Sequence, residues 1–210
     1  MTEYYVEGID LTSKSTVVRS ISEKYSISSR HKFLSGESEL MKEAKRVRAI
    51  SGMGGVATSL AYIKAISDDI ARHRDEPKNN KKVIQESTVI VKSYAIDKAM
   101  QADDYVLSEY DRLLKLHPNF TRSVFLTAST KQRLLRLDKR IAEEPETVTN
   151  NDLKLLRDPE SVLRIEDVMK SIAVTAFNAT VIDTSDMTPN EVSEEVSRSF
   201  GLAANEGGLV

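Results

Sequence analysis

The chain has 210 residues, a length that suits one domain, with 30 basic and 32 acidic side chains and a formal charge of −2. This balance provides no overall field for nucleic acid or an anionic membrane, so we expect neither as a partner, and recognition of phosphate must be local. The absence of cysteine excludes disulfides, thiolate nucleophiles and cysteine-based zinc sites. The first residues do not resemble a signal peptide, and no run of about 18 apolar residues occurs, so we expect a cytoplasmic protein.

Short apolar runs alternate with longer helical patterns along the chain, which is typical of a parallel α/β sheet. We predict strands at 4–7, 82–85, 123–127 and 179–183, with a weaker candidate near 26–33. We predict helices at 15–24, 56–74, 104–116, 130–143, 159–177 and 189–200. The last of these begins with a Thr188 cap, Pro189 at the first helical position and Glu191 in the first turn. We expect the tail at 201–210, which is small and weakly patterned, to fray.

The predicted helix at 130–143 carries two stripes of side chains. Apolar residues recur three and four apart and predict a buried face: Leu134, Leu137 and Ile141. A second stripe is basic: Arg133, Arg136 and Arg140. Arg136 and Arg140 lie four apart and can both reach a nucleotide, because a guanidinium fork suits phosphate oxygens. A solvated charged face explains the same pattern.

The most informative segment is YYVEGIDLTSKST at 4–16, an apolar strand that runs into a glycine turn and a Lys-Ser-Thr helix start. Its spacing fits the P-loop pattern of glycine, four residues, glycine, lysine and serine or threonine, except that Ser13 replaces the second glycine. In such a loop, backbone N–H groups cradle phosphates, the lysine reaches the β and γ phosphates, and the next hydroxyl binds magnesium. The predicted cradle consists of Gly8, Ile9, Asp10, Leu11, Thr12, Ser13, Lys14, Ser15 and Thr16. An ordinary strand-turn-helix connection is the alternative.

Ser13 stands where the pattern requires a backbone geometry that is easiest without a Cβ atom. We expect it to cost about 1 kcal/mol of strain or to crowd the phosphates. Replacing Ser13 with glycine should then raise ATP affinity or turnover.

Two carboxylates are candidates for the chemistry. Asp10 lies within the loop, and Glu86 ends a predicted strand, where open parallel sheets place their ligands. The alternatives are a turn residue that satisfies its own backbone for Asp10 and a surface carboxylate for Glu86. Phe33, Tyr62 and Tyr94 can stack on a base, but such aromatic residues are more often core. The three histidines are too dispersed to suggest a metal site.

The segment EGIDLTSKST resembles the loop of thymidylate kinases, which usually reads EG-[IVL]-D-G-x-G-K-[ST]-[ST]. The matching residues are Glu7, Gly8, Asp10, Lys14, Ser15 and Thr16. Leu11 and Ser13 replace residues that are commonly glycine in the family. The resemblance extends over roughly residues 3–200.

Three later segments resemble the family less closely. KKVIQEST corresponds to VI-x-D-R-[YF], with Glu86 on the acid near the metal and Ser87 on an arginine that helps to hold the acceptor phosphate. A second family arginine for that phosphate aligns with Ala65. SVFLTASTKQRLLRLDKR resembles the strand and helix that lead into the lid, although Thr127 and Gln132 replace acids. VIDTSDMTPNEVSEEV resembles the closing strand, which ends near the adenine, and the final helix.

The resemblance implies a three-layer α/β P-loop kinase with about five parallel strands in the order 2-3-1-4-5. It implies one domain at 1–200, a lid at about 136–160 and a homodimer. The implied activity is magnesium-dependent transfer of the ATP γ-phosphate to a nucleoside monophosphate, with dTMP the first candidate, in nucleotide biosynthesis. The implied catalytic residues are Lys14, Asp10, Glu86, Arg136 and Arg140, with Ser15 and Glu86 at the magnesium.

Two other functions fit the same residues. A kinase of a nucleoside or another small alcohol fits Glu86 and Ser87, because the acid is kept while the phosphate-holding arginine is lost. A nucleotide-binding or regulatory protein with weakened catalysis fits the departures at Ser13, Ser87 and Ala65, since a fold does not settle a function. Weak binding of ATP with magnesium would favour the weakened protein, and tight binding without turnover on dTMP would favour the alcohol kinase.

Overall fold

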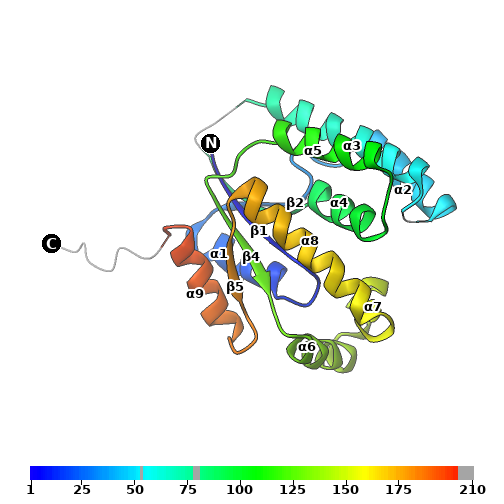
Figure 1. Ribbon diagram of the computed structural model, residues 1–210. Helices are drawn as coiled ribbons and strands as arrows, with labels where there is room; N and C mark the ends of the chain where they lie inside the picture. Colours follow the sequence, from blue (N-terminus) through cyan, green and yellow to red (C-terminus); the bar gives the residue numbers. More distant parts are fainter. Residues whose placement is uncertain (53, 78–80, 203–210) are drawn as a thin grey trace.

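The computed structural model describes residues 1–52, 54–77 and 81–202, and their centre is a five-stranded sheet (Figure 1). The strands pair in parallel in the order β2-β3-β1-β4-β5. The fold class predicted from the sequence is therefore confirmed, as is the strand order implied by the resemblance to thymidylate kinases. The strands are β1 (Thr2–Gly8), β2 (Ser28–Lys32), β3 (Lys82–Thr88), β4 (Arg122–Thr127) and β5 (Thr180–Asp183).

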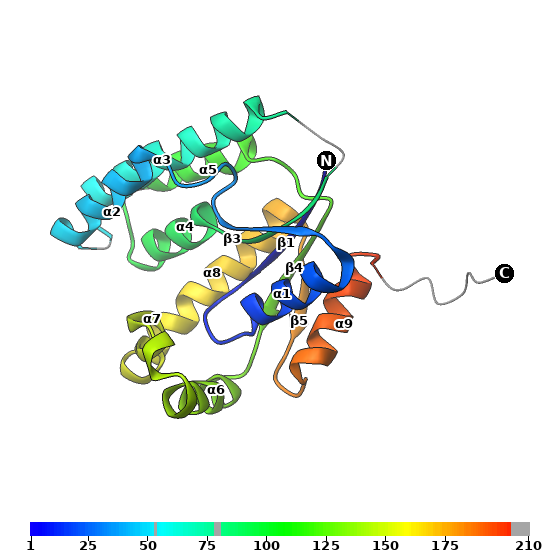
Figure 2. The ribbon, with the colours of Figure 1, turned by 180° about the vertical axis from the view of Figure 1, so that it is seen from behind.

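Helices cover both faces of the sheet and form the outer two of three layers (Figures 1 and 2). On one face lie α1 (Lys14–Tyr25) and α9 (Pro189–Ser199). On the other lie α4 (Val89–Ala99) and α8 (Pro159–Phe177), with further helices packed outside α4. The remaining helices are α2 (Glu39–Ser51), α3 (Val56–Asp75), α5 (Asp104–Leu116), α6 (Thr130–Glu143), the short 3₁₀ helix η1 (Pro145–Thr147) and α7 (Asn150–Arg157). No helix of the described residues is long and apolar enough to cross a membrane.

Strand β1 supplies side chains to the cores on both faces. Tyr4 and Val6 are buried with residues of α1 and α9. Tyr5, which lies between them in the sequence, is buried on the opposite face with residues of α4 and α8. This alternation follows from the two-residue period of a strand, and it explains why a strand buried on both faces reads as a continuous apolar run.

Three helices are additional to those predicted. Helix α4 follows β3 directly and begins with the residues Val89, Ile90 and Val91, which favour a strand. It is packed between the sheet, α8 and the outer helices, so its apolar residues do not lie on one stripe. Helix α2 is largely charged and buries only Met41 and Ala44. Helix α7 is only 8 residues long.

Helix α6 corrects the predicted division between apolar and basic stripes. Leu137 is fully buried as expected, but Ile141 is 41% exposed. Arg133, predicted on the basic stripe, is only 1% exposed. Because residues four apart share a helix face, Arg133 lies beside Leu137 on the buried side.

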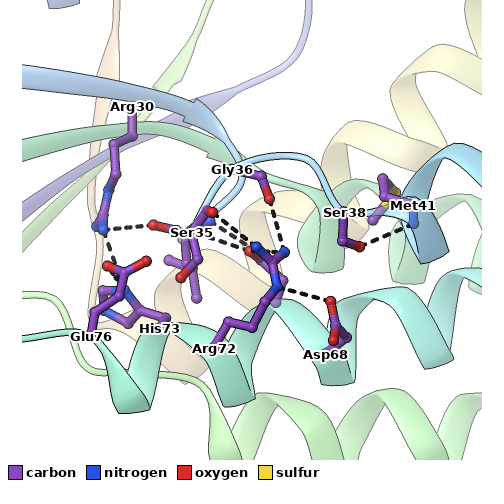
Figure 3. A network of polar contacts seen from close by, with 11 residues as sticks. Arg30, Ser35, Gly36, Ser38, Met41, Asp68, Arg72, His73 and Glu76 are labelled. Atoms are coloured by element: carbon purple, nitrogen blue, oxygen red, sulfur yellow. Dashed lines mark hydrogen bonds and ion pairs between the residues drawn. The ribbon is translucent and has the colours of Figure 1, made fainter.

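The connection from β2 to α2 is fastened to α3 by two charged side chains (Figure 3). Asp69 accepts hydrogen bonds from the backbone N–H groups of Leu34 and Ser35, at 2.8 and 3.0 Å. Arg72 donates to the carbonyls of Ser35 and Gly36, both at 2.9 Å. Burial raises the pKa of Asp69, although the backbone hydrogen bonds and Arg72 oppose this. These contacts fix the segment that follows the carboxyl end of β2.

Candidate active site

The loop after β1 has backbone turns that favour glycine, although only one of them is occupied by glycine. Gly8 has φ of 149°, and a Cβ atom there would lie 2.3 Å from the backbone oxygen of Leu126. Leu11 and Ser13 have φ of 68° and 69°, in the left-handed region. These are the two positions at which Leu and Ser replace the glycines of the thymidylate kinase pattern. The chain therefore retains the left-handed turns despite the two side chains.

Two side chains of the loop converge on the carbonyl of Ile9. Thr12 Oγ1 donates to this oxygen at 2.7 Å, and Lys14 Nζ donates to it at 2.8 Å. Burial lowers the pKa of Lys14, while the charges of Asp10 and Glu7 act in the opposite direction. Within the described residues, Lys14 has no carboxylate at ion-pair distance. Its ammonium group is held by the loop itself, which leaves its charge for a ligand.

Ser15 and Glu86 meet at the beginning of α1. Ser15 Oγ donates to Glu86 Oε1 at 2.5 Å, and His31 Nδ1 lies 3.5 Å from Glu86 Oε2. Burial works to raise the pKa of Glu86, but the hydrogen bonds from His31 and Ser15 outweigh it and hold this pKa below its usual value. A carboxylate and a hydroxyl are both oxygen ligands of the kind that magnesium accepts, and magnesium commonly needs only one or two protein ligands besides phosphates and waters. The described residues contain no group of three or more His, Cys, Asp or Glu that could hold a metal ion.

Asp10 faces helix α4, where Lys92 Nζ lies 3.3 Å from its Oδ2. Burial acts to raise the pKa of Asp10, yet the charges of Lys92 and Lys14 lower it overall. Lys32, at the end of β2, also lies within this field: burial and the charge of Lys92 lower its pKa, against the pull of Asp10. Three lysines thus surround the carboxylates of Asp10 and Glu86, and the group carries an excess positive charge.

A cavity of about 280 Å³ opens beside Asp10 and Lys92. This volume lies just below the usual range for small-molecule sites, roughly 300–1,000 Å³. A second cavity of about 30 Å³, between α3, α4 and α5, has room only for water. The larger cavity is lined from the loop by Ile9, Asp10 and Leu11, from α4 by Lys92, Ile96 and Met100, from α6 by Arg133, from α7 by Asn151, Asp152, Lys154 and Leu155, and from α8 by Ser161, Val162, Ile165 and Met169.

The two arginines predicted to reach a nucleotide lie in different places. Arg136 donates to the carbonyl of Leu11 at 3.0 Å and to Thr184 at 3.1 Å (Oγ1) and 2.7 Å (carbonyl). It therefore ties the loop to the end of β5, and burial lowers its pKa against the opposing charge of Asp183. Arg140 is 38% exposed and lies 3.3 Å from Asp152, so it links α6 to α7.

The remaining predicted residues of the loop are mainly structural. Ile9 and Leu11 are buried against Leu137, Leu155 and Val162. Thr16 is exposed in the first turn of α1.

The aromatic residues considered for stacking on a base lie in the core. Tyr62 and Tyr94 are buried there, as their residue type favours, and Phe33 packs against the same cluster.

Glu7 has a role that the sequence did not reveal. Its buried carboxylate accepts four hydrogen bonds, from Tyr5 Oη at 2.5 Å, Gly8 N at 3.1 Å, Ser87 Oγ at 2.7 Å and Thr88 N at 3.1 Å. It thus joins the ends of β1 and β3 beneath the loop. The sequence contained only the match of Glu7 to the family pattern, because partners 80 residues away are invisible without the register of the sheet.

A second buried charged group lies at the end of β4. Arg133 Nη1 donates to Glu166 Oε2 at 2.9 Å, and Thr127 Oγ1 donates to Glu166 Oε1 at 2.6 Å. Both charged side chains are at least 93% buried. The helical spacing placed Arg133 on α6, but nothing in the sequence paired it with a residue 33 positions away.

The fold is that of the P-loop kinases. The solved structures that it resembles include thymidylate kinase from Candida albicans, with a TM-score of 0.65, 16% identity and coverage of 94% of this chain and 89% of that one. Thymidylate kinase from Ehrlichia chaffeensis has a TM-score of 0.58, 17% identity and coverage of 95% and 98%. Deoxyadenosine kinase from M. mycoides with bound dCTP has a TM-score of 0.57, 16% identity and coverage of 95% and 99%. No family model and no curated protein matches the sequence.

Proposed function

We propose that this protein transfers the γ-phosphate of ATP, with magnesium, to a nucleoside monophosphate, with dTMP the first candidate. The observation that carries the proposal is that one loop joins two sites. Lys14 and Ser15 of the loop lie near Glu86, and Asp10 of the same loop borders the 280 Å³ cavity together with Lys92. Phosphoryl transfer requires this adjacency, because it depends mainly on positioning and charge.

On the ATP side, the backbone N–H groups from Gly8 to Thr16 would hold the phosphates, as at other helix N-termini. Lys14 would leave the Ile9 carbonyl and reach the β and γ phosphates. Ser15 and Glu86 would hold magnesium, which, when bound, neutralises charge on the transferred group. Arg136 and Arg140 belong to the proposed lid segment at 136–160, and on closure over the nucleotide they would stabilise the charge that develops.

On the acceptor side, the cavity would take the second substrate and Asp10 would contact it. Ser87 and Ala65 provide no cation for the acceptor phosphate. Lys92 supports the proposal because it lies 3.3 Å from Asp10 and lines the same cavity. Lys32 adds a second charge in the same field. These lysines would hold the phosphate that the family holds with arginines.

A kinase of a nucleoside or another small alcohol is the second candidate. The hydroxyl of Ser87 donates to Glu7 at 2.7 Å, so position 87 takes part in the fold instead of facing a ligand. Glu86 retains a lowered pKa and would accept a proton from an alcohol only weakly. This favours the monophosphate, whose attacking oxygen is already ionised. A protein with weakened catalysis remains the third candidate, because Ser13 is strained.

ADP release from ATP and magnesium, measured across nucleosides and nucleoside monophosphates, tests the proposal. We expect turnover on a monophosphate that Lys14→Ala abolishes and that Lys24→Ala, at the exposed far end of the same helix, leaves intact. Turnover on nucleosides alone would move the assignment to the second candidate. Weak or absent binding of ATP, with no turnover on either class, would favour the third.

The same proposal includes a single kinase domain over 1–200 and a homodimer. Light scattering on the full chain tests the oligomeric state. A monomeric mass at protein concentrations where the enzyme is fully active would contradict the homodimer without affecting the proposed reaction.

A further inference from the structure

Arg133 is a buried cation with an unused hydrogen-bond donor. Its side chain is 1% exposed and donates through Nη1 to Glu166 at 2.9 Å. Its Nε is buried and has no hydrogen-bond partner among the residues that the structure describes. The same side chain lines the 280 Å³ cavity beside Asp10. A buried donor without a partner is unusual in native proteins, so this one requires an explanation.

The pair formed by Arg133 and Glu166 gives little stability by itself. Burying two charges costs about as much as their attraction returns, and apolar residues of similar size often serve the fold as well or better. Thr127 supplies a further hydrogen bond to Glu166 at 2.6 Å, which holds the carboxylate, and thereby Arg133, in place. The arrangement is therefore costly as structure and well suited to presenting a fixed guanidinium to the cavity.

The charges around the cavity determine what Arg133 can bind. Glu166 offsets Arg133, and Lys92 offsets Asp10. Asp152, which also lines the cavity, is paired with Arg140, and Lys154, the remaining charged residue of the lining, is exposed to solvent. A phosphate group would need a net positive charge around it to leave water for a buried site beside Arg133. Because Arg133 is already neutralised by Glu166, its free donor suits an uncharged oxygen, while the phosphate of the substrate would lie beside Lys92.

We propose that Arg133 is a specificity-determining residue that donates a hydrogen bond to an uncharged oxygen of the second substrate, a sugar hydroxyl or a base carbonyl. Glu166 and Thr127 act as positioning residues for it. This inference rests on the proposed function, since it takes the cavity to be the acceptor site. With Arg133 in this role, the site would exclude acceptors that present only apolar atoms to Arg133.

The test compares dTMP with two analogues, each of which lacks one of the two candidate acceptor groups. The 2′,3′-dideoxy monophosphate lacks the sugar hydroxyl, and 2-deoxyribose 5-phosphate lacks the base. The variant is Arg133→Met combined with Glu166→Leu, which leaves no unpaired buried charge. Arg133→Lys, which keeps a cation beside Glu166 without the planar fork, is the second variant. Lys131→Met, on the exposed side of the same helix, is the matched control.

We expect the wild type to prefer dTMP over one analogue by about ten- to a hundredfold in kcat/KM, the usual value of a hydrogen bond to a charged group. The double variant should lose that preference through a higher KM for dTMP, with the KM for ATP unchanged. Arg133→Lys should lose most of it, and Lys131→Met none. Identical preferences in the wild type and the double variant would overturn the inference.

Equilibrium binding of dTMP, measured by calorimetry on the same proteins, separates the two proposals. If the wild type binds dTMP without phosphorylating it and the double variant binds it at least tenfold more weakly, the proposed reaction fails while the role of Arg133 stands. If the wild type turns over dTMP and the double variant binds it equally well, only the role of Arg133 fails. If the wild type does not bind dTMP or any nucleoside, both fail.

Discussion

Ser13 offers a direct measurement of what a serine costs at a glycine position of the loop. With φ of 69° and ψ of 15°, it is in the left-handed conformation, and its side chain makes no capping hydrogen bond to α1. A side chain in this conformation costs about 1–2 kcal/mol, of which roughly half remains after the greater flexibility of glycine in the unfolded chain is subtracted. Ser13→Gly should therefore stabilise the protein by about 0.5–1 kcal/mol, or about 2 °C in Tm.

Binding of ATP with magnesium tests whether the Cβ atom of Ser13 also affects the phosphates. Strain that is equal in the free and bound states changes stability but not affinity. Only direct crowding would make Ser13→Gly bind ATP more tightly, by about two- to fivefold if it is worth up to 1 kcal/mol. Ser26 is the matched control, because it ends the same helix at φ of 52° and ψ of 43°. Ser26→Gly should give the same stabilisation and leave ATP affinity unchanged.

The reasoning is tested by urea denaturation and calorimetric titration of both variants. Ser13→Ala keeps the Cβ atom and should not stabilise the protein. If Ser13→Gly is no more stable than Ser13→Ala, the left-handed turn is not strained and the argument is wrong. If both glycine variants are stabilised but the affinity for ATP is unchanged, the loop is strained without crowding its ligand.

Three further measurements address other parts of the site and the fold. Glu7→Gln should lose about 2–4 kcal/mol of unfolding free energy in urea, because the amide cannot accept all four hydrogen bonds. Glu23→Gln, on the exposed side of α1, should lose almost nothing. A loss below about 1 kcal/mol for Glu7→Gln would contradict this role of Glu7. Glu86→Gln should raise the magnesium concentration for half-maximal turnover by about tenfold or more. It should leave the binding of ATP without magnesium unchanged. An unchanged magnesium requirement would show that Glu86 does not hold the metal. Burial lowers the pKa of His117 from 6.5 to about 4, so the unfolded chain protonates this histidine at a higher pH than the folded chain does. The folded state therefore loses stability as the pH falls from about 6.5 to about 4, by about 3 kcal/mol in total. The stability of the wild type relative to His117→Phe should therefore fall by about 3 kcal/mol between about pH 6.5 and pH 4, and a difference that does not change with pH would show that His117 is not responsible.

The strands and the position of the loop could be predicted because they depend on local patterns, whereas the order of the strands was implied only by the resemblance to thymidylate kinases. The segment from Tyr4 to Thr16 contains its strand, its turn and its helix start in sequence order. The capping signal at Thr188, with Glu191 three residues later, is likewise local, and the structure contains the complete capping box. Helix α4 could not be predicted in this way, because burial on several sides removes the periodic contrast that identifies a helix.

Residues that act through distant partners could not be predicted. Lys92 borders the cavity only because α4 lies opposite Asp10, 82 positions away. The helical pattern predicts Arg133 on a basic stripe, since a charged side chain on a helix normally faces water. Its partner Glu166 lies on α8, and no spacing rule connects the two helices. The registers of helix packing are set by side-chain volumes across the whole core, which a single sequence does not reveal.

Two departures from the thymidylate kinase pattern have defined partners in the structure. Ser87, in place of an arginine, donates to the carboxylate of Glu7, and Thr127, in place of an acid, donates to Glu166. The substituted hydroxyls complete the hydrogen bonding of two buried carboxylates, one beneath the loop and one paired with Arg133. Because a buried carboxylate without partners is costly, these hydroxyls offset part of what the fold loses when the family's residues are absent. The substitutions therefore fit the proposed site, in which lysines beside the cavity and Arg133 in its lining would hold the second substrate.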